Sequence, residues 1–424
     1  MDKNRKPKFG IWYRAGAMVL VSLGMVYSDY VLSQTVGTIE PRSSSTRRNT
    51  SPGSMPSTDG VVSGFYPSLS VSVARQKNVL RSSGKQESDT VVTISPSILY
   101  GLEAGSYDLK VRYRTDLYAF SKFSNEDSNN HQIDGNLILD LTNKIDVSLG
   151  ASYIEGSEFR GQLGSRLFVG ATPDKFNETS YDVGTIIGRR DSTLQLAVKA
   201  GASRLRYTNN NQQIRDRDSG YIRGSVIYNI GAVTSLNLNV AQTDVDYLEV
   251  GTQGNLDGVE TSIGLGARWA PTEATRFRVD VGNTKRKFDD PSQSDFSGVT
   301  YAGRVIWQPV EYSTVSIFGS HSVEETTDLE SSYIVGDLYG IDWRHALTDI
   351  WTVNAYYEQG TDDFNIGRRD QVAEFGGGLF YNWFNWLSIG IQYANTKRDS
   401  SLNAADFNDE VVYLTFTTNF NVGG

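Results

Sequence analysis

Polar and apolar side chains alternate with a period of two along most of this 424-residue chain. Residues 107–120 (YDLKVRYRTDLYAF) place mainly apolar side chains at the odd positions and charged side chains at the even positions up to Asp116. Residues 132–141 and 145–154 repeat this alternation. Because successive side chains of a β-strand point to opposite faces, each segment predicts a strand with one apolar and one polar face.

The pattern predicts about 18 strands, and their connections alternate in length. Short connections such as 231–234 (GAVT) follow long polar ones such as 209–218 (NNNQQIRDRD). This asymmetry is typical of outer-membrane barrels, whose tilted strands need about 9–11 residues to cross the bilayer. We therefore predict an all-β fold, a transmembrane antiparallel β-barrel of 16–18 strands with short periplasmic turns and long extracellular loops. The expected strands are 66–75, 90–100, 107–120, 132–141, 145–154, 179–188, 193–207, 219–229, 235–247, 259–269, 275–286, 297–308, 313–323, 333–344, 351–359, 370–383, 387–398 and 410–421.

The composition excludes several other classes of protein. The chain has no cysteine and three histidines that are far apart, so we expect no metal or other cofactor. Its formal net charge of −9 argues against a nucleic-acid partner. A hydrophobic content of 38% does not supply the apolar runs of about 20 residues that a helical membrane protein needs. The sequence also contains no serine-hydrolase, zinc-protease or P-loop motif, so we do not expect an enzyme.

The N-terminus has the features of an export signal. Five basic residues precede Ala15, and an apolar stretch follows from Ala15 to about Tyr27. Val31 and Ser33 are suitable for the −3 and −1 positions of a cleavage site. A single membrane anchor is the alternative, but the apolar stretch is short for a span. The expected organisation is a signal peptide at 1–33, a disordered periplasmic leader at 34–62 and an outer-membrane barrel at 63–424.

Charged residues on the polar faces are candidates for the wall of an aqueous lumen. A barrel of about 18 strands leaves room for a channel, and rings of charge would set its selectivity. Arginine suits bidentate contacts with carboxylate or phosphate groups. The alternative is that these groups pair with one another as structural salt bridges. The candidates along a substrate path are Lys110, Arg112, Arg114, Asp116, Lys199, Arg223, Arg268, Arg276, Arg278, Arg304, Arg344 and Glu374.

One column of cations stands out on the third expected strand. Lys110, Arg112 and Arg114 occupy alternate positions about 6.6–7 Å apart, with Asp116 next in line. One aspartate cannot balance three cations, so two positive charges remain unless acids of the next strand, such as Asp134, pair with them. If they do not, the column would form a ladder for the carboxylate groups of a passing polymer.

Aromatic residues gather at the strand ends beside the short connections. Tryptophan and tyrosine favour the headgroup zone of a membrane, so we expect these residues to form a periplasmic interface girdle. In a soluble protein they would instead be core residues. The girdle candidates are Tyr107, Trp269, Trp307, Trp343, Trp351, Trp383 and Trp386.

The long connections hold most of the acidic surplus, including 289–295 and 324–330. We hypothesise that these acids hold divalent cations against lipopolysaccharide, or repel an anionic polymer leaving the cell. Solubility of exposed loops explains them equally well.

The first 90 or so residues of the expected barrel resemble a known family. Over 66–154 the chain is similar to β-barrel porins encoded in exopolysaccharide loci, and afterwards the pattern alone continues. The matching positions are Asn78, Val79, Leu80, Ser88, Asp89, Pro96, Tyr100, Tyr113, Asp116 and Tyr118. The resemblance implies export, through the outer membrane of a Gram-negative bacterium, of an exopolysaccharide made by a Wzx/Wzy-type pathway. Implied partners are the polysaccharide, a periplasmic polysaccharide export protein, outer-membrane lipid and lipopolysaccharide.

Two other functions stay open. One is a diffusion porin for small anionic solutes, which a constricting, inward-folded loop would favour. The other is a barrel that serves as a structural anchor or adhesin, which a plugged lumen would favour.

Overall fold

The computed structural model describes residues 63–160, 172–189, 191–251, 254–326 and 330–420. The predicted signal peptide and leader lie outside these residues. In chain order the strands are β1 (Gly64–Gln76), β2 (Asp89–Ala104), β3 (Tyr107–Phe120), β4 (Ser128–Thr142), β5 (Ile145–Glu158), β6 (Asp174–Ile187), β7 (Leu194–Tyr207), β8 (Arg217–Ile230), β9 (Thr234–Tyr247), β10 (Gly258–Thr272), β11 (Thr275–Phe288), β12 (Phe296–Val310), β13 (Ser313–Glu324), β14 (Ile334–Ala346), β15 (Trp351–Phe364), β16 (Arg369–Phe384), β17 (Leu387–Ser400) and β18 (Phe407–Asn419).

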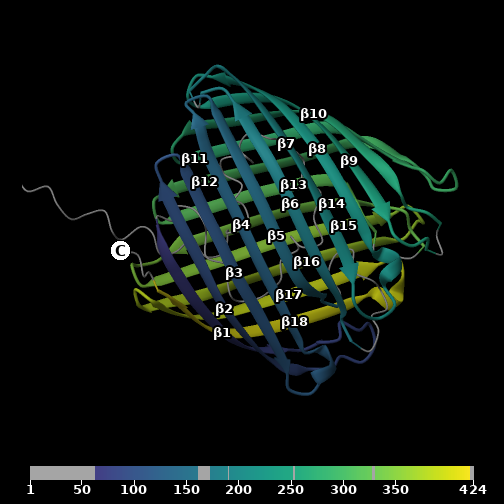
Figure 1. Ribbon diagram of the computed structural model, residues 1–424. Coiled ribbons are helices and arrows are strands. Elements are labelled where there is room, and N and C mark those ends of the chain that lie inside the picture. The colour runs from purple at the N-terminus through teal and green to yellow at the C-terminus, as the bar shows by residue number, and fades with distance from the viewer. Residues whose placement is uncertain (1–62, 161–171, 190, 252–253, 327–329, 421–424) are drawn as a thin grey trace, which may run out of the picture.

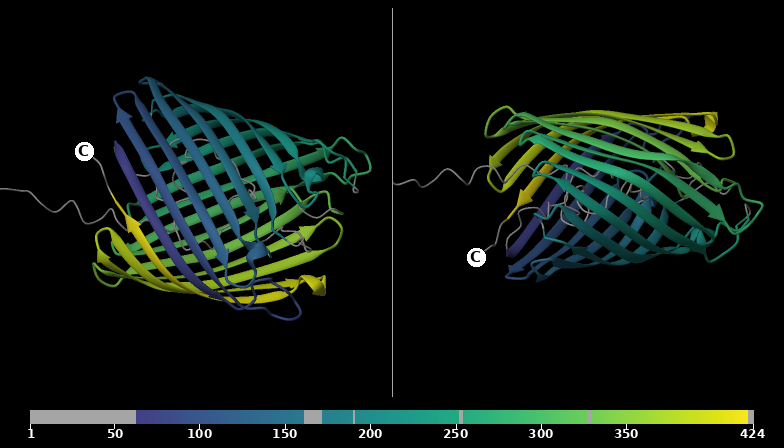
Figure 2. Two further views of the ribbon diagram at one scale, coloured as in Figure 1. Left: turned by 60° about the horizontal axis from the view of Figure 1, so that its bottom comes forward. Right: turned by 90° about the horizontal axis from the view of Figure 1, so that it is seen from above.

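These 18 strands form one closed antiparallel barrel, as predicted. Each strand pairs with its neighbour in sequence, and β1 also pairs with β18, with Ser68 opposite Asn419 and Gln76 opposite Val411. Figures 1 and 2 show the first and last strands side by side at this seam and the tilt of all strands around the wall. Closure leaves no sheet edge unpaired, as a barrel in lipid requires.

The connections follow the predicted alternation. Two residues separate β2 from β3, whereas residues 77–88 separate β1 from β2. Because the strands alternate in direction, the start of β1 and the end of β18 lie on the side of the short turns. Three short 3-10 helices, at Ser124–Glu126, Gln213–Arg215 and Asn403–Ala405, lie in long connections. No helix among the described residues is long and apolar enough to span a membrane.

Several strands extend further toward the long loops than their sequence pattern predicts. We expected a strand at 351–359, but β15 continues to Phe364, where Asp362 and Asp363 pair with Asp370 and Arg369 of β16. The strands remain paired there because the inter-strand hydrogen bonds join backbone N–H and C=O groups and do not require apolar side chains. The apolar alternation that marks a lipid-facing strand has ended by then.

Large apolar side chains lie mainly on the outside of the barrel. Exposed examples on one strand are Leu236, Leu238 and Val240 of β9, each more than two-fifths exposed. A small apolar cluster of Ile186 and its neighbours Ala197 and Ile227 faces inward. This inside-out arrangement of apolar residues suits a protein whose solvent is lipid.

Candidate functional site: the lumen wall

The alternation along β3 separates a lumen face from a lipid face. Arg112 and Arg114 are 8% and 5% exposed, whereas Tyr107 and Tyr113 are 41% and 40% exposed. Every predicted substrate-path residue likewise lies on the side of its strand opposite the exposed apolar residues. These residues are spread over β3, β7, β8, β10, β11, β12, β14 and β16, so they line the lumen without forming one compact site.

The cation column on β3 is paired with wall carboxylates. Arg112 donates from Nε and Nη2 to Asp134 of β4, both at 3.0 Å. Lys110 Nζ lies 3.0 Å from Asp108. Arg114 binds Asp116 through Nη2 at 2.7 Å. Of the two alternatives left open by the sequence, the structure has the paired one: Asp134 pairs with Arg112, and Asp108, which the charge count had omitted, pairs with Lys110.

Other predicted lumen residues also have partners within the wall. Lys199 Nζ lies 3.3 Å from Asp182, and the guanidinium of Arg304 lies over the ring of Phe318, 5.0 Å from its centroid. Glu374 accepts hydrogen bonds from the hydroxyls of Tyr356 and Thr396, at 2.8 and 3.1 Å. Most of these groups are thus held in fixed positions.

Three arginines lie side by side at one level of the wall. In the strand register, Arg268 of β10 is opposite Arg278 of β11, which is in turn opposite Arg304 of β12. Directly opposed residues in an antiparallel sheet have their Cβ atoms about 5 Å apart. We call Arg268, Arg278 and Arg304 the arginine row; Arg276 is the next inward residue toward the short turns. Asp280 accepts a hydrogen bond from Arg278 Nε at 3.0 Å and is the nearest inward acid along β11.

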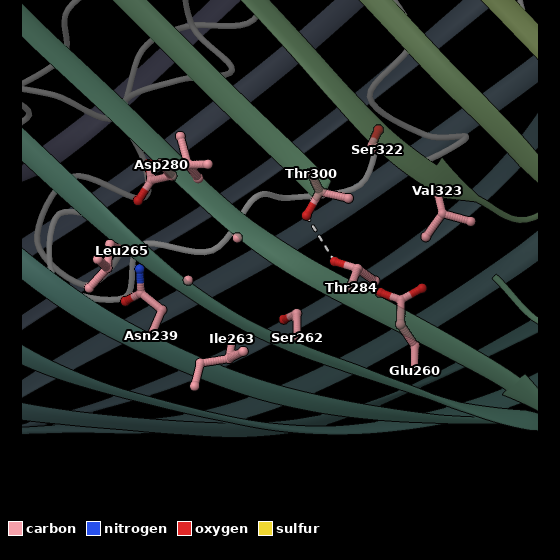
Figure 3. A pocket seen from close by; sticks show the side chains of 13 residues that line it. Asn239, Glu260, Ser262, Ile263, Leu265, Asp280, Thr284, Thr300, Ser322 and Val323 are labelled. Atoms are coloured by element: carbon pink, nitrogen blue, oxygen red, sulfur yellow. Dashed lines mark hydrogen bonds between the residues drawn. The ribbon is translucent and has the colours of Figure 1, made fainter. Parts of the chain in front are cut away.

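A shallow recess lies between the arginine row and the extracellular rim (Figure 3). Residues of β9–β13 line it, including the carboxylates of Glu260 and Asp280, and the hydroxyls of Thr284 and Thr300 share a hydrogen bond of 2.9 Å. Its floor includes Gly282, where a Cβ atom would lie 2.7 Å from the carbonyl oxygen of Ile263. The wall is hollowed there because only a hydrogen atom fits above the neighbouring backbone.

At the extracellular end, the side chain of Glu325, the residue directly after β13, faces the lumen. The hydroxyl of Tyr247, at the end of β9, donates to Glu325 at 2.5 Å. Arg286 of β11 also binds this carboxylate. Burial alone would raise the pKa of Glu325, but Arg286 and Arg217 outweigh it and hold the pKa below its ordinary value. Glu325 lies in the connection after β13, as expected, but its carboxylate is bound to the inner wall and only 24% exposed instead of free in a solvated acidic loop.

Sequence analysis missed Arg286, although it continues the even-numbered series of Arg276 and Arg278 along β11. It also missed a second extracellular cluster, in which Arg215 Nη2 lies 2.6 Å from Glu158. Burial opposes the charge of Arg215, yet the surrounding oxygen atoms of Tyr207 and the Glu158 carboxylate raise its pKa above the ordinary value.

Aspartates in the long connections bind the backbone at the strand ends. In five connections, the last residue of one strand donates its N–H to the aspartate that immediately precedes the next strand. We call this contact the aspartate bracket. The pairs are Phe120–Asp127, Tyr207–Asp216, Tyr247–Asp257, Phe288–Asp295 and Ser400–Asp406, at 2.6–3.1 Å.

The brackets explain part of the acidic surplus without a metal. Asp290 likewise accepts backbone N–H groups of Ser292 and Asn255, which lower its pKa. Among the described residues, no group of three or more histidine or acidic side chains is placed to hold a metal ion. Cations shared between loop acids and lipopolysaccharide need no such group, so that hypothesis stays a prediction.

The girdle candidates are all exposed and lie near the short turns. Their exposed fractions range from 37% for Trp351 to 56% for Trp383. The rings of Trp269 and Phe277 stack 5.1 Å apart on adjacent strands. This placement is compatible with the predicted periplasmic girdle.

One family model matches residues 64–420, and its description is "Putative beta-barrel porin 2". The chain belongs to this family. It is a porin-like β-barrel of the Gram-negative outer membrane, and its family consists of channels rather than enzymes. No curated protein matches the chain in sequence.

Solved structures share the barrel architecture at low sequence identity. Pseudomonas aeruginosa OccK2 (OpdF) is 10% identical, with a TM-score of 0.47 over 84% of this chain and 98% of that chain. Pseudomonas aeruginosa OccK11 (OpdR) is 12% identical, with a TM-score of 0.43 over 85% and 99%. The FrpB iron transporter from Neisseria meningitidis is 11% identical, with a TM-score of 0.47 over 80% and 64%.

Proposed function

We propose that the barrel is a diffusion channel that passes small polar solutes and favours anions. The arginine row is the observation that supports the anion preference. Three guanidinium groups lie at one level of the lumen wall, on neighbouring strands, and the nearest inward acid along β11, Asp280, is hydrogen-bonded to Arg278, so the level keeps a local excess of cationic groups over that one carboxylate. Arginine keeps its charge at any physiological pH, so this preference would not depend on titration.

The inward contact of Glu325 supports a small-solute channel over an anchor or a polymer exporter. This residue joins the end of β13 to side chains of β9 and β11, so the start of the connection is held against the lumen wall. A side chain held across the inner wall at this level hinders a long polymer more than a small solute.

Export of exopolysaccharide, our main expectation from the sequence, loses its residue-level support. The cation column on β3 was the proposed ladder for a passing polymer. Its charges are balanced by Asp108, Asp134 and Asp116 within the wall. A neutralised column offers a polymer carboxylate little attraction.

Planar-bilayer recordings in a salt gradient test the anion preference. Arg268→Gln combined with Arg304→Gln leaves the Arg278–Asp280 pair intact. The Coulomb energy between a unit charge and an ion ~4 Å away is ~1 kcal/mol even in water. Losing that attraction for anions should lower the anion-to-cation permeability ratio about fivefold. The reversal potential should shift toward the equilibrium potential of the cation.

The matched control removes two arginines from the outer face of the barrel. Arg204 and Arg206 lie on the lipid-facing side of β7 and contact Asp218. Arg204→Gln plus Arg206→Gln should leave the permeability ratio unchanged. The proposal fails if the lumen variant folds, judged by heat-modifiable gel mobility, and keeps wild-type selectivity.

A further inference from the structure

Exposed cations at the extracellular rim are mostly neutralised by carboxylates of the same wall. Lys77 lies 2.7 Å from Glu410, and Lys397 lies 2.9 Å from Asp399. Arg369 likewise lies 3.4 Å from Asp363. Such pairs leave little net charge for an external ligand.

Lys285 and Lys287 of β11 depart from this pattern. Both are exposed, and neither forms a salt bridge with any residue that the structure describes. In the strand register Lys285 lies between Thr261 and Ser297, and Lys287 is opposite Val259. The nearest acid on the β12 side is Asp295, which precedes Phe296 and whose carboxylate accepts the backbone N–H of Phe288. Alternate residues of a strand are about 6.6–7 Å apart, so the two charges form a compact pair.

An exposed apolar surface lies directly below this lysine pair. Val279 and Val281 precede the lysines on the same face of β11, and both are nearly half exposed. On the neighbouring strands, Ile263, Leu265 and Val299 are between 56% and 67% exposed. This surface suits acyl chains, and the lysines mark the level at which the hydrocarbon gives way to headgroups.

We propose that Lys285 and Lys287 bind the phosphate groups of a phosphorylated, multiply acylated glycolipid of the lipid A type in the outer leaflet. An ammonium group is a compact point charge that binds phosphate well. Two such groups above a continuous apolar surface match a lipid that carries phosphates above several acyl chains. The surface takes the headgroup phosphate together with the acyl chains, rather than free phosphate. This site is independent of solute passage through the lumen.

Native mass spectrometry of the purified protein in detergent tests the proposal. The probe is diphosphoryl lipid A, compared with the same lipid A after removal of its phosphates. Wild-type protein should retain the diphosphoryl form preferentially. Lys285→Gln plus Lys287→Gln should weaken that binding about tenfold, since each basic residue near an anionic headgroup contributes a several-fold factor. Inorganic phosphate should not compete at equal concentration, because it has no acyl chains.

Two further variants separate this site from a general effect of charge. Lys285→Arg plus Lys287→Arg keeps both charges and should bind diphosphoryl lipid A like wild type. Lys77→Gln plus Lys397→Gln removes two lysines from the same rim that already have carboxylate partners, and it should keep the preference. Unchanged binding by the Lys285/Lys287 glutamine variant would overturn the proposal. An equal loss in the Lys77/Lys397 variant would overturn it as well.

Discussion

Charged side chains that face the lumen are matched to partners one or two positions away in the sheet. Arg114 and Asp116 lie on one strand, whereas Arg112 and Asp134 lie on adjacent strands. Each guanidinium is thereby fixed in position, and local neutralisation limits the repulsion that a crowded lumen would otherwise create. Glu325 extends this principle to a loop, because its carboxylate joins β13 to Arg286 and Tyr247 across the intervening strands.

Replacing Glu325 should release the start of the β13–β14 connection. Glu325→Gln removes a charge-assisted contact to Arg286, which is worth about 2 kcal/mol, or roughly thirtyfold in amide protection. Hydrogen exchange at the amides of Glu325 and Thr326 should accelerate accordingly at pH 7. Asp289→Asn, an exposed acid of another extracellular loop, serves as the control. Equal protection in wild type and the glutamine variant at pH 7 would refute the anchoring role.

The anchor should also be lost in acid. The pKa of Glu325 is lowered in the folded protein, so its stabilisation is fully present above the ordinary value of 4.5. It declines as the pH falls through the lowered pKa. The difference in protection between wild type and the glutamine variant, corrected for intrinsic exchange, should therefore begin to shrink below about pH 4.5 and vanish below the lowered pKa.

At the scale of strands and loops, the period-two pattern predicted every strand because lipid and lumen impose opposite demands on the two faces. It placed the strand ends near the long loops less well, as at β15. Side chains on both faces are polar there, so the alternation of polar and apolar residues that marks a strand is absent. It also assigned Arg268 and Arg112 to the correct face. It named Asp134 as a candidate partner for the cation column but could not assign it to Arg112, because a carboxylate on a neighbouring strand is matched to one cation only once the register of the two strands is known.

The aspartate brackets make a separate prediction for single loops. Asp295→Ala removes the acceptor for the Phe288 N–H and should cost about 1 kcal/mol locally, since this site is exposed. The Phe288 amide should exchange roughly fivefold faster, with little change in the temperature at which the whole barrel unfolds. Asp289→Ala in the same loop removes an equal charge and should leave Phe288 protected. Equal exchange rates in the two variants would contradict the bracket.

For the whole molecule, the closed barrel separates two chemical surfaces. The outer wall is charged at the extracellular rim and apolar between this rim and the short turns. The lysine pair lies at the boundary, next to exposed valines and isoleucine. The inner wall combines paired charges, a recess lined by hydroxyls and two carboxylates, and the arginine row. These features are the basis of the proposed passage for small hydrophilic solutes.

Solute entry into proteoliposomes tests this central claim most directly. Liposome swelling compares gluconate, glucose and glucosamine, which are similar in size and differ mainly in charge. We predict swelling well above that of protein-free liposomes for all three, fastest for gluconate and slowest for glucosamine, with long dextrans excluded. Swelling no faster than in protein-free liposomes, or free entry of long dextrans, would contradict a small-solute channel, and glucosamine entering faster than gluconate would contradict the anion preference.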